Sequence, residues 1–557
     1  MKQEIFITRN MPAMSEYIPL RTPFSNVSFT PDVPSNALAP NEYNSGLNVE
    51  TDVRGVRKVL GEQYILSTIP GNVVFIDAGY RTQTQWVNIV ATREGKWYML
   101  TASGISNITP GVGANPSVAL SGYTDDIVIT SSWVGQVFII NDGLRPPMYF
   151  GNYLASGSPQ TEIAIYDSAP DSYVWNYESV VGVTSVTAGF VRNYCSPNVG
   201  NILIAGNLTK SYSTGFTINY PTTIRWSQAF ANTTVPNTWN PTLNNIANEQ
   251  EIPVRGPIID GFFLGGNFYI CSFWDTIVLS PINYQNSTAP IFGVRLFNQG
   301  RGLINENCWT NTDSMVYGID ARDIWQFDGS NFTGIGNQVI KNYFFSNLNQ
   351  TYVNRLYMVN NTQKYQIEIY YPDLNSTGWC NKMISYRYDL QVWNAPKDVQ
   401  NAAHGVEAPV FNTTFALASR TVIYAQGSTS GSQIIQTAVT NAFCGNTINC
   451  YFERTNIALS TPDGPIPYSS KVYIHRLLPE MSGTGTVNIT VGGANSTAQT
   501  PVYGQTGVVS ISTDTPWVTT QQNNVRTVAL KFGSNDATNT WQISAMNWQG
   551  MITEDAF

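Results

Sequence analysis

The sequence predicts an all-β protein. Short apolar runs that alternate with polar residues fill the chain, and each run is bounded by Gly, Asn, Asp or Pro. Hardly any window shows the i, i+3, i+4, i+7 spacing of an amphipathic helix. The composition agrees, since 30 Tyr, 25 Phe, 14 Trp and 44 Gly favour strands and turns. A hydrophobic share of 42% with only 12% charged residues suffices for large cores and argues against disorder.

Residues 1–48 form the first predicted region. They are rich in Pro and Asn, as in TPFSNVSFTPDVPSNALAPNEYNSG, and they hold too little apolar material for a core of their own. We therefore expect an extended N-terminal arm that becomes ordered on a neighbouring subunit or an adjacent ring.

Residues 49–450 contain recurrent units in which an apolar strand, a polar turn and a second strand follow each other. The clearest copies lie at 97–100, 134–149, 266–281, 315–336 and 382–396. Units of two to four antiparallel strands cannot cover both of their faces alone, and radial stacking is one way to cover them. We expect a β-propeller core of about six or seven blades, with insertions. A string of β-sandwiches would show the same spacing of turns and stays open as the alternative.

Residues 451–557 have a different pattern. Their strands are well separated and have few aromatic turns, as in KVYIHRLLPEMSGTGTVNITVGG, VRTVALKF and TWQISAMNWQGMI. This pattern fits either an additional β-sandwich-like C-terminal domain or the last blade that closes the ring.

The formal net charge is −8. Proteins that grip nucleic acid neutralise phosphates with clustered Lys and Arg, so we expect no stable nucleic-acid binding. The N-terminus MKQEIFITRNMPAMSEY lacks the apolar segment of a secretory signal, and no stretch approaches the roughly 18 apolar residues that span a bilayer. We therefore expect no membrane span and maturation in a reducing cytoplasm.

The chain has six cysteines and no CxxC motif, so neither a disulfide framework nor a zinc site is expected. Cys271 lies in an alternating strand and should be buried, and the others should mostly be free thiols. Cys444 and Cys450 flank a GNTIN loop and are the one pair spaced for a cross-link.

Residues that carry chemistry at neutral pH are scarce. His404, in the small-residue loop NAAHGVE, and His475, in the strand KVYIHRLLP, are the only histidines. Neither has a nucleophile, a second His or a Cys at ligand spacing, so we expect both to be structural and predict no catalytic, cofactor or metal-binding residue. P-loop and dinucleotide motifs are absent.

Two sequence patterns are nearer to a known functional motif: a set of possible calcium ligands and a segment similar to an Asp-box. Oxygen ligands for calcium could come from Asp125 and Asp126 or from Asp320, Asp323 and Asp328, but Asx turns and caps explain these residues more simply. The segment SNDATNTW at 534–541 resembles the Asp-box of sialidase-like propellers, with Thr538 where the glycine belongs. In that family the box is a structural turn.

A longer resemblance covers residues 223–336. The sequence TIRWSQAFANTTVPNTWNPT at 223–242 is followed by GPIIDGFFLGGNFYICSFWDTIVLSP at 256–281 and by GLINENCWTNTDSMVYGIDARDIWQFDGSNFTGIG at 302–336. These segments resemble the β-propeller tail nozzle, or tail tubular protein, of short-tailed bacteriophages. A weaker, general similarity of residue pattern extends over residues 50–550.

The resemblance implies a structural virion protein that is assembled in the host cytoplasm and has no enzymatic activity. It further implies a ring, commonly of six subunits, below the tail adaptor, with loops that receive tail fibres or touch the host surface. Genomic DNA would pass through the ring, and a wall without basic residues would not hold it.

Two other functions remain open at this point. Exposed Trp and Tyr could stack on sugars in a receptor-binding or carbohydrate-recognising propeller, although alternation with aliphatic residues favours core packing. A sialidase-like glycosidase would use a pair of carboxylates, which one sequence cannot nominate.

Overall fold

A computed structural model of the protein describes residues 18–82, 85–111, 121–124, 126–151, 159–168, 173–196, 200–282, 291–409, 420–427, 432–457, 459–461, 464–497, 499–511 and 517–554. The chain divides into two compact units. One comprises residues 1–60, 392–397 and 441–557, and the other comprises residues 61–391 and 398–440. Strands dominate both units, which confirms the predicted all-β class.

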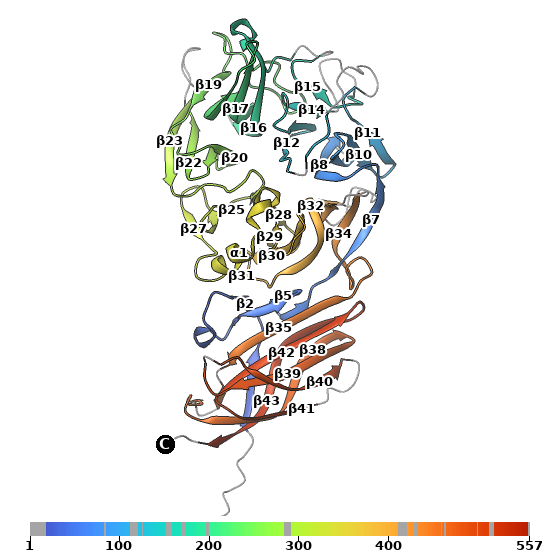
Figure 1. Ribbon diagram of the computed structural model, residues 1–557, viewed down its shortest axis with the longest axis vertical. Coiled ribbons are helices and arrows are strands. Elements are labelled where there is room, and N and C mark those ends of the chain that lie inside the picture. The colour runs from blue at the N-terminus through green and yellow to red at the C-terminus, as the bar shows by residue number, and fades with distance from the viewer. Residues whose placement is uncertain are drawn as a thin grey trace, which may run out of the picture. The chain divides into compact units, whose positions relative to one another are not determined.

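The second unit is a β-propeller. Five successive four-stranded antiparallel sheets have their strands in sequence order, and a larger sheet supplies two further blades. Figure 1 shows these sheets around a common centre, from β8 in blue through β16–β23 in green to β34 in orange. The first strands of successive sheets, such as β12, β16 and β20, lie side by side. The seven blades in the described residues agree with the expected six or seven.

The strands of the first three blades are β8 (Val73–Thr82), β9 (Gln85–Thr92), β10 (Trp97–Thr101) and β11 (Gly104–Asn107); β12 (Thr130–Val134), β13 (Val137–Asn141), β14 (Met148–Gly151) and β15 (Ala164–Ile165); and β16 (Val183–Ser196), β17 (Gly200–Tyr212), β18 (Thr217–Trp226) and β19 (Asn248–Glu251). The next two blades consist of β20 (Ile258–Leu264), β21 (Asn267–Ser272), β22 (Asp275–Pro281) and β23 (Phe292–Gln299), and of β24 (Trp309–Asn311), β25 (Val316–Ile319), β26 (Ile324–Phe327) and β27 (Phe332–Gly334). The strand expected at 97–100 lies in β10, and the turns expected within 134–149, 266–281 and 315–336 join strands.

A sheet shared by the sixth and seventh blades closes the ring. It contains β28 (Tyr357–Asn361), β29 (Gln366–Tyr371), β30 (Cys380–Arg387), β32 (Lys397–Pro409), β33 (Arg420–Gln426), β34 (Ser432–Thr440) and β7 (Gly61–Ile69). Because β7 precedes the first blade in the chain but pairs with β34 at the end of the last, the propeller is closed by its own N-terminal strand. Helix α1 (Lys341–Asn347) and the 3-10 segment η3 (Gln350–Arg355) precede β28.

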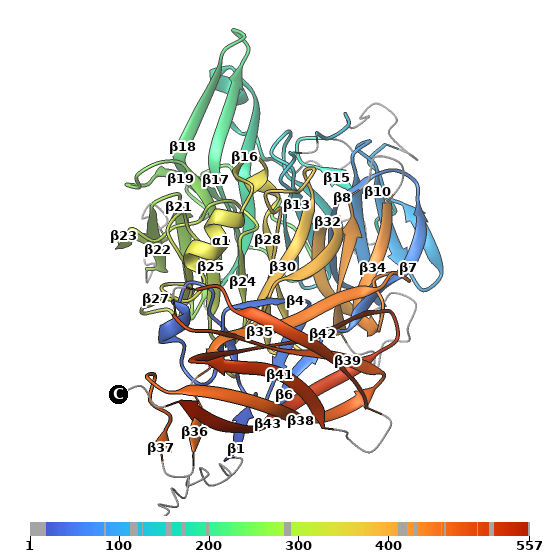
Figure 2. The same cartoon turned by 60° about the horizontal axis from the view of Figure 1, so that its bottom comes forward.

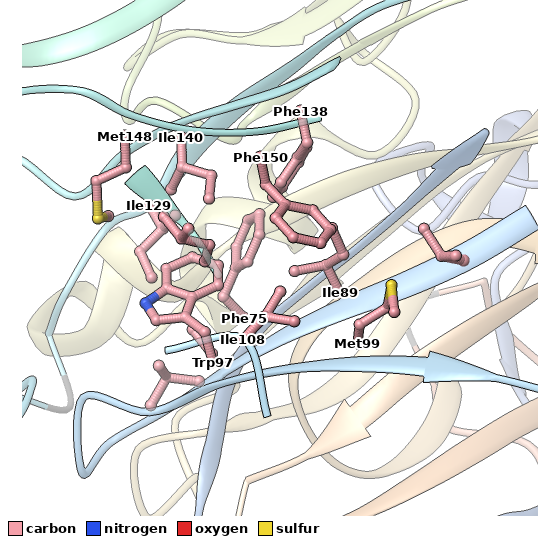
Figure 3. Packing of buried hydrophobic residues seen from close by; sticks show 14 of the residues in the cluster. Phe75, Ile89, Trp97, Met99, Ile108, Ile129, Phe138, Ile140, Met148 and Phe150 are labelled. Atoms are coloured by element: carbon pink, nitrogen blue, oxygen red, sulfur yellow. The ribbon is translucent and has the colours of Figure 1, made fainter. Parts of the chain in front are cut away.

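Apolar side chains that alternate along the strands fill the space between neighbouring blades. Between the first and second blades, Phe75, Trp97, Phe138 and Phe150 pack with aliphatic residues from both sheets (Figure 3). Each is at most 2% exposed. Burial of such side chains stabilises the fold by roughly 1.5–3 kcal/mol each, so these layers hold the blades together.

The first unit is a β-sandwich built from both ends of the chain. One sheet has the order β41-β38-β43-β6-β5, with β1 also paired to β43, and the other has the order β4-β35-β42-β39-β40. These strands are β1 (Ile18–Pro23), β4 (Ser45–Leu47), β5 (Val49–Asp52), β6 (Gly55–Lys58), β35 (Ile448–Ile457), β38 (Lys471–Thr484), β39 (Thr486–Ala494), β40 (Val502–Ser510), β41 (Val518–Val525), β42 (Thr527–Asp536) and β43 (Thr540–Glu554). Phe532 of one sheet packs against Trp541 of the other, with ring centroids 5.7 Å apart.

Short elements complete the first unit. They are β2 (Ser28–Phe29), η1 (Ser35–Ala37), β3 (Glu42–Tyr43), β31 (Val392–Trp393), β36 (Ser460–Thr461) and β37 (Gly464–Pro465). No helix among the residues that the structure describes is long and apolar enough to cross a bilayer.

The described part of the predicted arm, residues 18–48, belongs to the sandwich instead of standing apart. Phe24 is fully buried and packs edge-on against Phe452 and Phe532, at 5.3 and 5.5 Å between ring centroids. Arg454 donates hydrogen bonds to the carbonyl oxygens of Ala39 and Pro40. Residues 49–60 and 441–450, expected in the propeller, likewise belong to this unit. A few large aromatic residues anchor a segment whose average composition is polar.

Candidate functional site

The axis of the propeller is the first place to look for a site, because the innermost strands of all blades converge there. Asp77, Arg192, Asp260, Glu306 and His404 lie in or beside these strands and are called the axial cluster below. Only His404 among these five residues is a candidate that the sequence pattern indicates. The other four come from different blades, and their one sequence signal is a charged residue inside or beside an apolar strand.

The centre of the axial cluster is a buried ion pair. Arg192 of β16 donates to both carboxylate oxygens of Asp260 of β20, at 2.9 and 2.5 Å. The indole N–H of Trp309 in β24 donates to the same carboxylate at 2.7 Å. Asp260 is fully buried, so its charge depends on these donors. The geometry leaves the carboxylate neutralised and held, which does not suit a nucleophile or a general base.

Hydrogen bonds also cross the axis between blades that are not neighbours. Asn307, beside β24, donates to the carbonyl oxygen of Ile129, beside β12, at 3.3 Å. Arg355 of η3 forms an ion pair with Asp126 at 3.0 Å. Arg192 additionally donates to the carbonyl oxygen of Glu306 at 3.4 Å. Side chains from blades that are not neighbours therefore meet across the axis.

His404 lies on β32 and not in the loop that was expected. The small residues on both sides of it, Ala402, Ala403 and Gly405, belong to the same strand. Its Nδ1 is 2.9 Å from the carbonyl oxygen of Ile76, and its ring lies between those of Phe75 and Tyr357. Removal from water lowers the pKa of His404 to about 4, so the ring is neutral at pH 7. It is a hydrogen-bonded structural histidine.

Two carboxyl groups of the axial cluster have raised pKa values. Removal from water, with the nearby Asp260 as a smaller cause, raises the pKa of Glu306 to about 7. Removal from water also raises the pKa of Asp77, although Ser131 donates to it at 2.5 Å. A shifted carboxyl can act as a general acid where a substrate reaches it. The cavity beside His404 and Tyr357 holds only about 30 Å³, enough for one or two water molecules and too small for a sugar ring.

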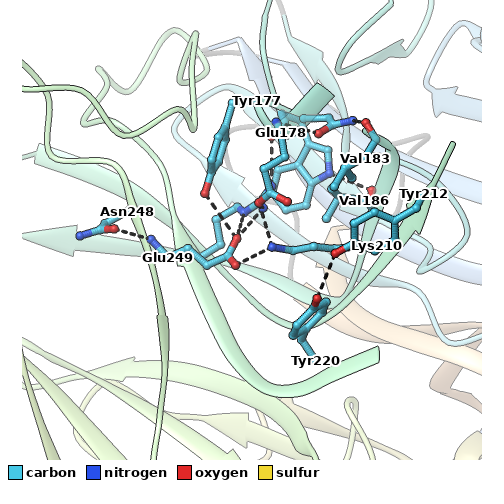
Figure 4. A network of polar contacts seen from close by, with 12 residues as sticks. Tyr177, Glu178, Val183, Val186, Lys210, Tyr212, Tyr220, Asn248 and Glu249 are labelled. Atoms are coloured by element: carbon cyan, nitrogen blue, oxygen red, sulfur yellow. Dashed lines mark hydrogen bonds and ion pairs between the residues drawn. The ribbon is translucent and has the colours of Figure 1, made fainter. Parts of the chain in front are cut away.

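A second charged group lies in the third blade, and Arg225 and Glu249 of this group fall within residues 223–336, which carry the nozzle resemblance. Arg225, fully buried, donates to Glu178 at 2.6 Å and to Glu249 at 2.5 Å, and Lys210 bridges the same two carboxylates at 2.8 and 2.7 Å (Figure 4). Burial alone would raise the pKa of Glu249, but Arg225 and Lys210 outweigh this effect and lower it. Two cations neutralise two anions, so neither carboxylate is available as an acid or base.

Aromatic rings enclose this network. The guanidinium of Arg225 lies 5.0 Å from the ring of Trp175 and 4.6 Å from that of Tyr177, and Lys210 lies 5.0 Å from Tyr220. The Trp175 ring in turn packs edge-on against Trp239 at 4.6 Å. Arg225 of the RWS segment and Trp239 of the Trp-Asn-Pro segment thus meet in one structural centre of the third blade.

The remaining segments of the resemblance are structural in the same way. Asp275 of WDTIVLSP is paired with Arg255 at 2.6 Å. Arg301 bridges Asp320 at 3.0 Å and Asp323 at 3.4 Å. Asp320 also accepts from the backbone N–H groups of residues 322 and 323, which is the expected Asx turn.

The calcium candidates do not form a site within the described residues, among which no group of three or more metal-ligating side chains occurs. Asp328 accepts hydrogen bonds from the backbone N–H groups of Ser330 and Asn331, again as an Asx turn. Asp126 is paired with Arg355, and Asp125 lies outside the described residues.

The Asp-box-like segment is a structural turn between β42 and β43. Asp536 accepts from the backbone N–H groups of Thr538 and Asn539, and Lys58 donates to it at 3.0 Å. The indole N–H of Trp541 donates to Ser534 at 3.0 Å. These bonds close the turn over its own tryptophan. His475 lies on β38, as expected.

The cysteines are free thiols in the structure, and Cys271 is buried as predicted. Cys444 and Cys450 are not cross-linked. Burial raises the pKa of Cys308 to about 12, which leaves that thiol unreactive.

Most tryptophans serve the cores rather than the surface. Trp274 and Trp517 are the exposed ones, at 38% and 40%, and each has an arginine over its ring: Arg322 at 5.4 Å and Arg476 at 4.2 Å. The buried ones are Trp97, Trp175, Trp226, Trp239, Trp325, Trp393, Trp541 and Trp548. Core packing therefore explains most of these rings, as the alternation predicted.

Comparisons with known proteins leave the function open. No protein-family model and no curated protein matches the chain. Among solved structures, a crystal structure of BBS1N in complex with ARL6DN, soaked with mercury, matches with a TM-score of 0.38 and 7% sequence identity, covering 70% of this chain and 98% of that one. A likeness of this degree carries no argument about function.

Proposed function

We propose that the protein is a structural component of a virion, the tail nozzle or tail tube of a short-tailed bacteriophage. One observation carries the proposal. The three segments that resemble nozzle proteins fall in consecutive blades, the third to the fifth, and Arg225, Trp239, Asp275 and Asp320 of these segments form ion pairs and a tryptophan contact with partners in the same blades. The similarity thus concerns a scaffold, and a scaffold is what a conduit requires.

In this proposal, the DNA does not pass along the axis of a single propeller. A duplex cannot enter a space that side chains of the axial cluster occupy, so the path runs through the centre of a ring of subunits and beside each propeller. Six copies below the tail adaptor, as the resemblance implies, form such a ring. The net charge of −8 allows DNA to pass without being held.

The third blade offers a surface for contacts with another subunit. Its strands β16, β17 and β18 have 14, 13 and 10 residues and extend beyond their neighbours in Figure 2. Val180, Val181 and Phe216 lie at their end and are 95%, 72% and 71% exposed. Exposed apolar groups of this kind mark interaction sites, and we assign this one to a neighbouring copy in the ring.

Electron microscopy of the purified protein and of intact particles tests the proposal. We expect annular oligomers in solution and density for the propeller in the tail. Replacing Val180, Val181 and Phe216 with Ser should reduce ring formation, whereas Leu374→Ser, at a 63% exposed loop position of the same propeller, should not. A compact monomer that is absent from the tail would overturn the proposal, and glycan binding that depends on Trp274 would favour a carbohydrate-recognising propeller.

A further inference from the structure

A cavity at one end of the β-sandwich has the features of a binding site. It measures about 180 Å³ and lies where strands of both sheets end, close to the β36–β37 hairpin. Its walls are mainly apolar, and its lining includes Ile457, Leu459, Ile466, Val472 and Val528. A closed apolar cavity of about 150 Å³ binds benzene, so this one has room for a ring or a branched chain.

One charged side chain, that of Arg526, lines this apolar cavity. Its Nε is buried and has no hydrogen-bond partner, and the guanidinium forms no ion pair with any residue that the structure describes. An arginine near apolar walls ordinarily pairs with a carboxylate or a carbonyl oxygen, because an unsatisfied buried donor is destabilising. Arg526 as a whole is half-buried, and its unpaired Nε–H is a donor from which an anion in the cavity can accept a hydrogen bond.

The backbone around Arg526 is firmly held. Arg526 is the single residue between β41 and β42, where the chain crosses from one sheet to the other. Its N–H donates to the carbonyl oxygen of Ala494 at 3.1 Å, and the hydroxyl of Thr527 donates to the same oxygen at 3.1 Å. Val525 and Val528 on either side are 5% and 1% exposed. The backbone from which the Arg526 side chain extends into the cavity lining is therefore fixed.

The rim of the cavity suits a ligand that enters from solvent. Tyr468 is 50% exposed, and its hydroxyl accepts a hydrogen bond from the backbone N–H of Thr497 at 3.1 Å. The ring is thus anchored at the mouth, where it can cover an apolar group.

We propose that this cavity binds an apolar group that bears one carboxylate, with Arg526 as the partner of the carboxylate. The planar guanidinium matches the two carboxylate oxygens, and the aliphatic walls match a ring or a branched chain. The same chemistry occurs in a free small acid and in a polypeptide chain that ends in an apolar residue. The site does not depend on the assembly proposed above.

Calorimetric titration of the full chain tests this site. Benzoate should bind with one site per chain, and benzamide, which has the same shape without the charge, should bind at least tenfold more weakly. Arg526→Gln should weaken benzoate binding at least tenfold and leave benzamide unchanged. Arg476→Gln is the matched control, because Arg476 lies in the same unit but stacks on Trp517 outside the cavity.

Further titrations separate the two sources of the ligand. Tighter binding of N-acetylphenylalanine than of benzoate supports a polypeptide chain end, and the reverse order supports a free acid. Val472→Phe fills the cavity with a larger apolar side chain and should abolish binding of all probes in a protein that still unfolds cooperatively. Absence of benzoate binding to the unaltered chain, or binding that Arg526→Gln does not weaken, would overturn the proposal.

Discussion

Several charged side chains lie in the interior of this protein, and most of them have a specific partner there. Arg192 with Asp260 and Arg225 with two glutamates are examples in which the partner lies on another strand. Removing one member of such a pair leaves a buried charge without compensation, which destabilises a fold by about 3–5 kcal/mol.

The first prediction concerns Arg225. Arg225→Met should lower the free energy of unfolding of the propeller by about 3–5 kcal/mol, because Glu178 and Glu249 then share only Lys210. Arg322→Met, an exposed position that stacks on Trp274 in the same propeller, should change it by less than about 1 kcal/mol. Denaturant unfolding of both variants provides the comparison, and equal effects would contradict the structural role of the network.

The second prediction concerns pH. Glu306 keeps its proton up to a pKa of about 7 in the folded protein, against 4.5 ordinarily, so its contribution is full below pH 4.5 and is lost as the pH rises to 7. His404, with a pKa of about 4 against 6.5, contributes stability above pH 6.5 that is lost as the pH falls to 4. Each pKa unit corresponds to about 1.4 kcal/mol, so the two effects oppose each other between pH 4.5 and 6.5.

Single variants should therefore reveal opposite slopes. Glu306→Gln should become less stable as the pH falls from 6.5 to 4.5, because only the histidine effect remains. His404→Gln should become more stable over the same interval, and the slope of the double variant should lie between those of the two single variants. Thermal unfolding across this pH range is the measurement, and parallel profiles for the two single variants would refute the assignment.

At the scale of the element, the outermost strand of a blade has two different roles. In six blades this strand follows the other strands of its own sheet in the sequence. In the seventh blade it is β7, which precedes the first blade in the sequence and pairs with β34. Loss of an ordinary outer strand frays one blade. Loss of β7 opens the ring.

Two matched isoleucines test this difference. Ile69 in β7 and Ile165 in β15 are 4% and 7% exposed, and replacement of either with Asp should destabilise the protein by about 3 kcal/mol or more. Ile69→Asp should also increase amide hydrogen exchange in both the first and the seventh blade, whereas the effect of Ile165→Asp should stay within the second blade. Exchange confined to β7 and β34 would contradict ring closure by this strand.

Elements were largely predictable from the sequence, and the sites were not. Turn residues such as the Asn-Asp-Gly after β13 determine a hairpin locally, so the strand–turn–strand units could be recognised one by one. The axial cluster could not, because Arg192 and Asp260 are 68 residues apart and meet only when two blades stand side by side. The cavity around Arg526 likewise depends on strands from distant parts of the chain.

At the scale of the whole molecule, the sandwich is completed by residues from both ends of the chain. Phe24, β1 and the carbonyl groups that Arg454 contacts all lie before the propeller in the sequence. The polar composition of residues 1–48 predicted an arm because an average over a window hides single buried aromatic residues. The propeller, in contrast, has all its strands between residues 61 and 440.

Deletion of residues 1–40 should therefore unfold the sandwich and spare the propeller. We expect limited proteolysis of the shortened chain to leave a resistant fragment of about residues 61–440, together with one lost unfolding transition. Phe24→Ala should weaken the same transition by roughly 3–5 kcal/mol without removing it. A shortened chain that retains both transitions would restore the view of this segment as an arm.

The pairing of β7 with β34 has a consequence for synthesis. Ribosomes add about 5–20 residues per second, so β7 emerges on the order of tens of seconds before the strand that it must join. During that interval its edge has no partner, and on a polysome identical edges of several nascent chains lie near one another. Each chain therefore stops being prone to aggregation through this edge only when β34 of the last blade has been made and pairs with β7. Slower translation of residues 70–431 should consequently lower the yield of native protein.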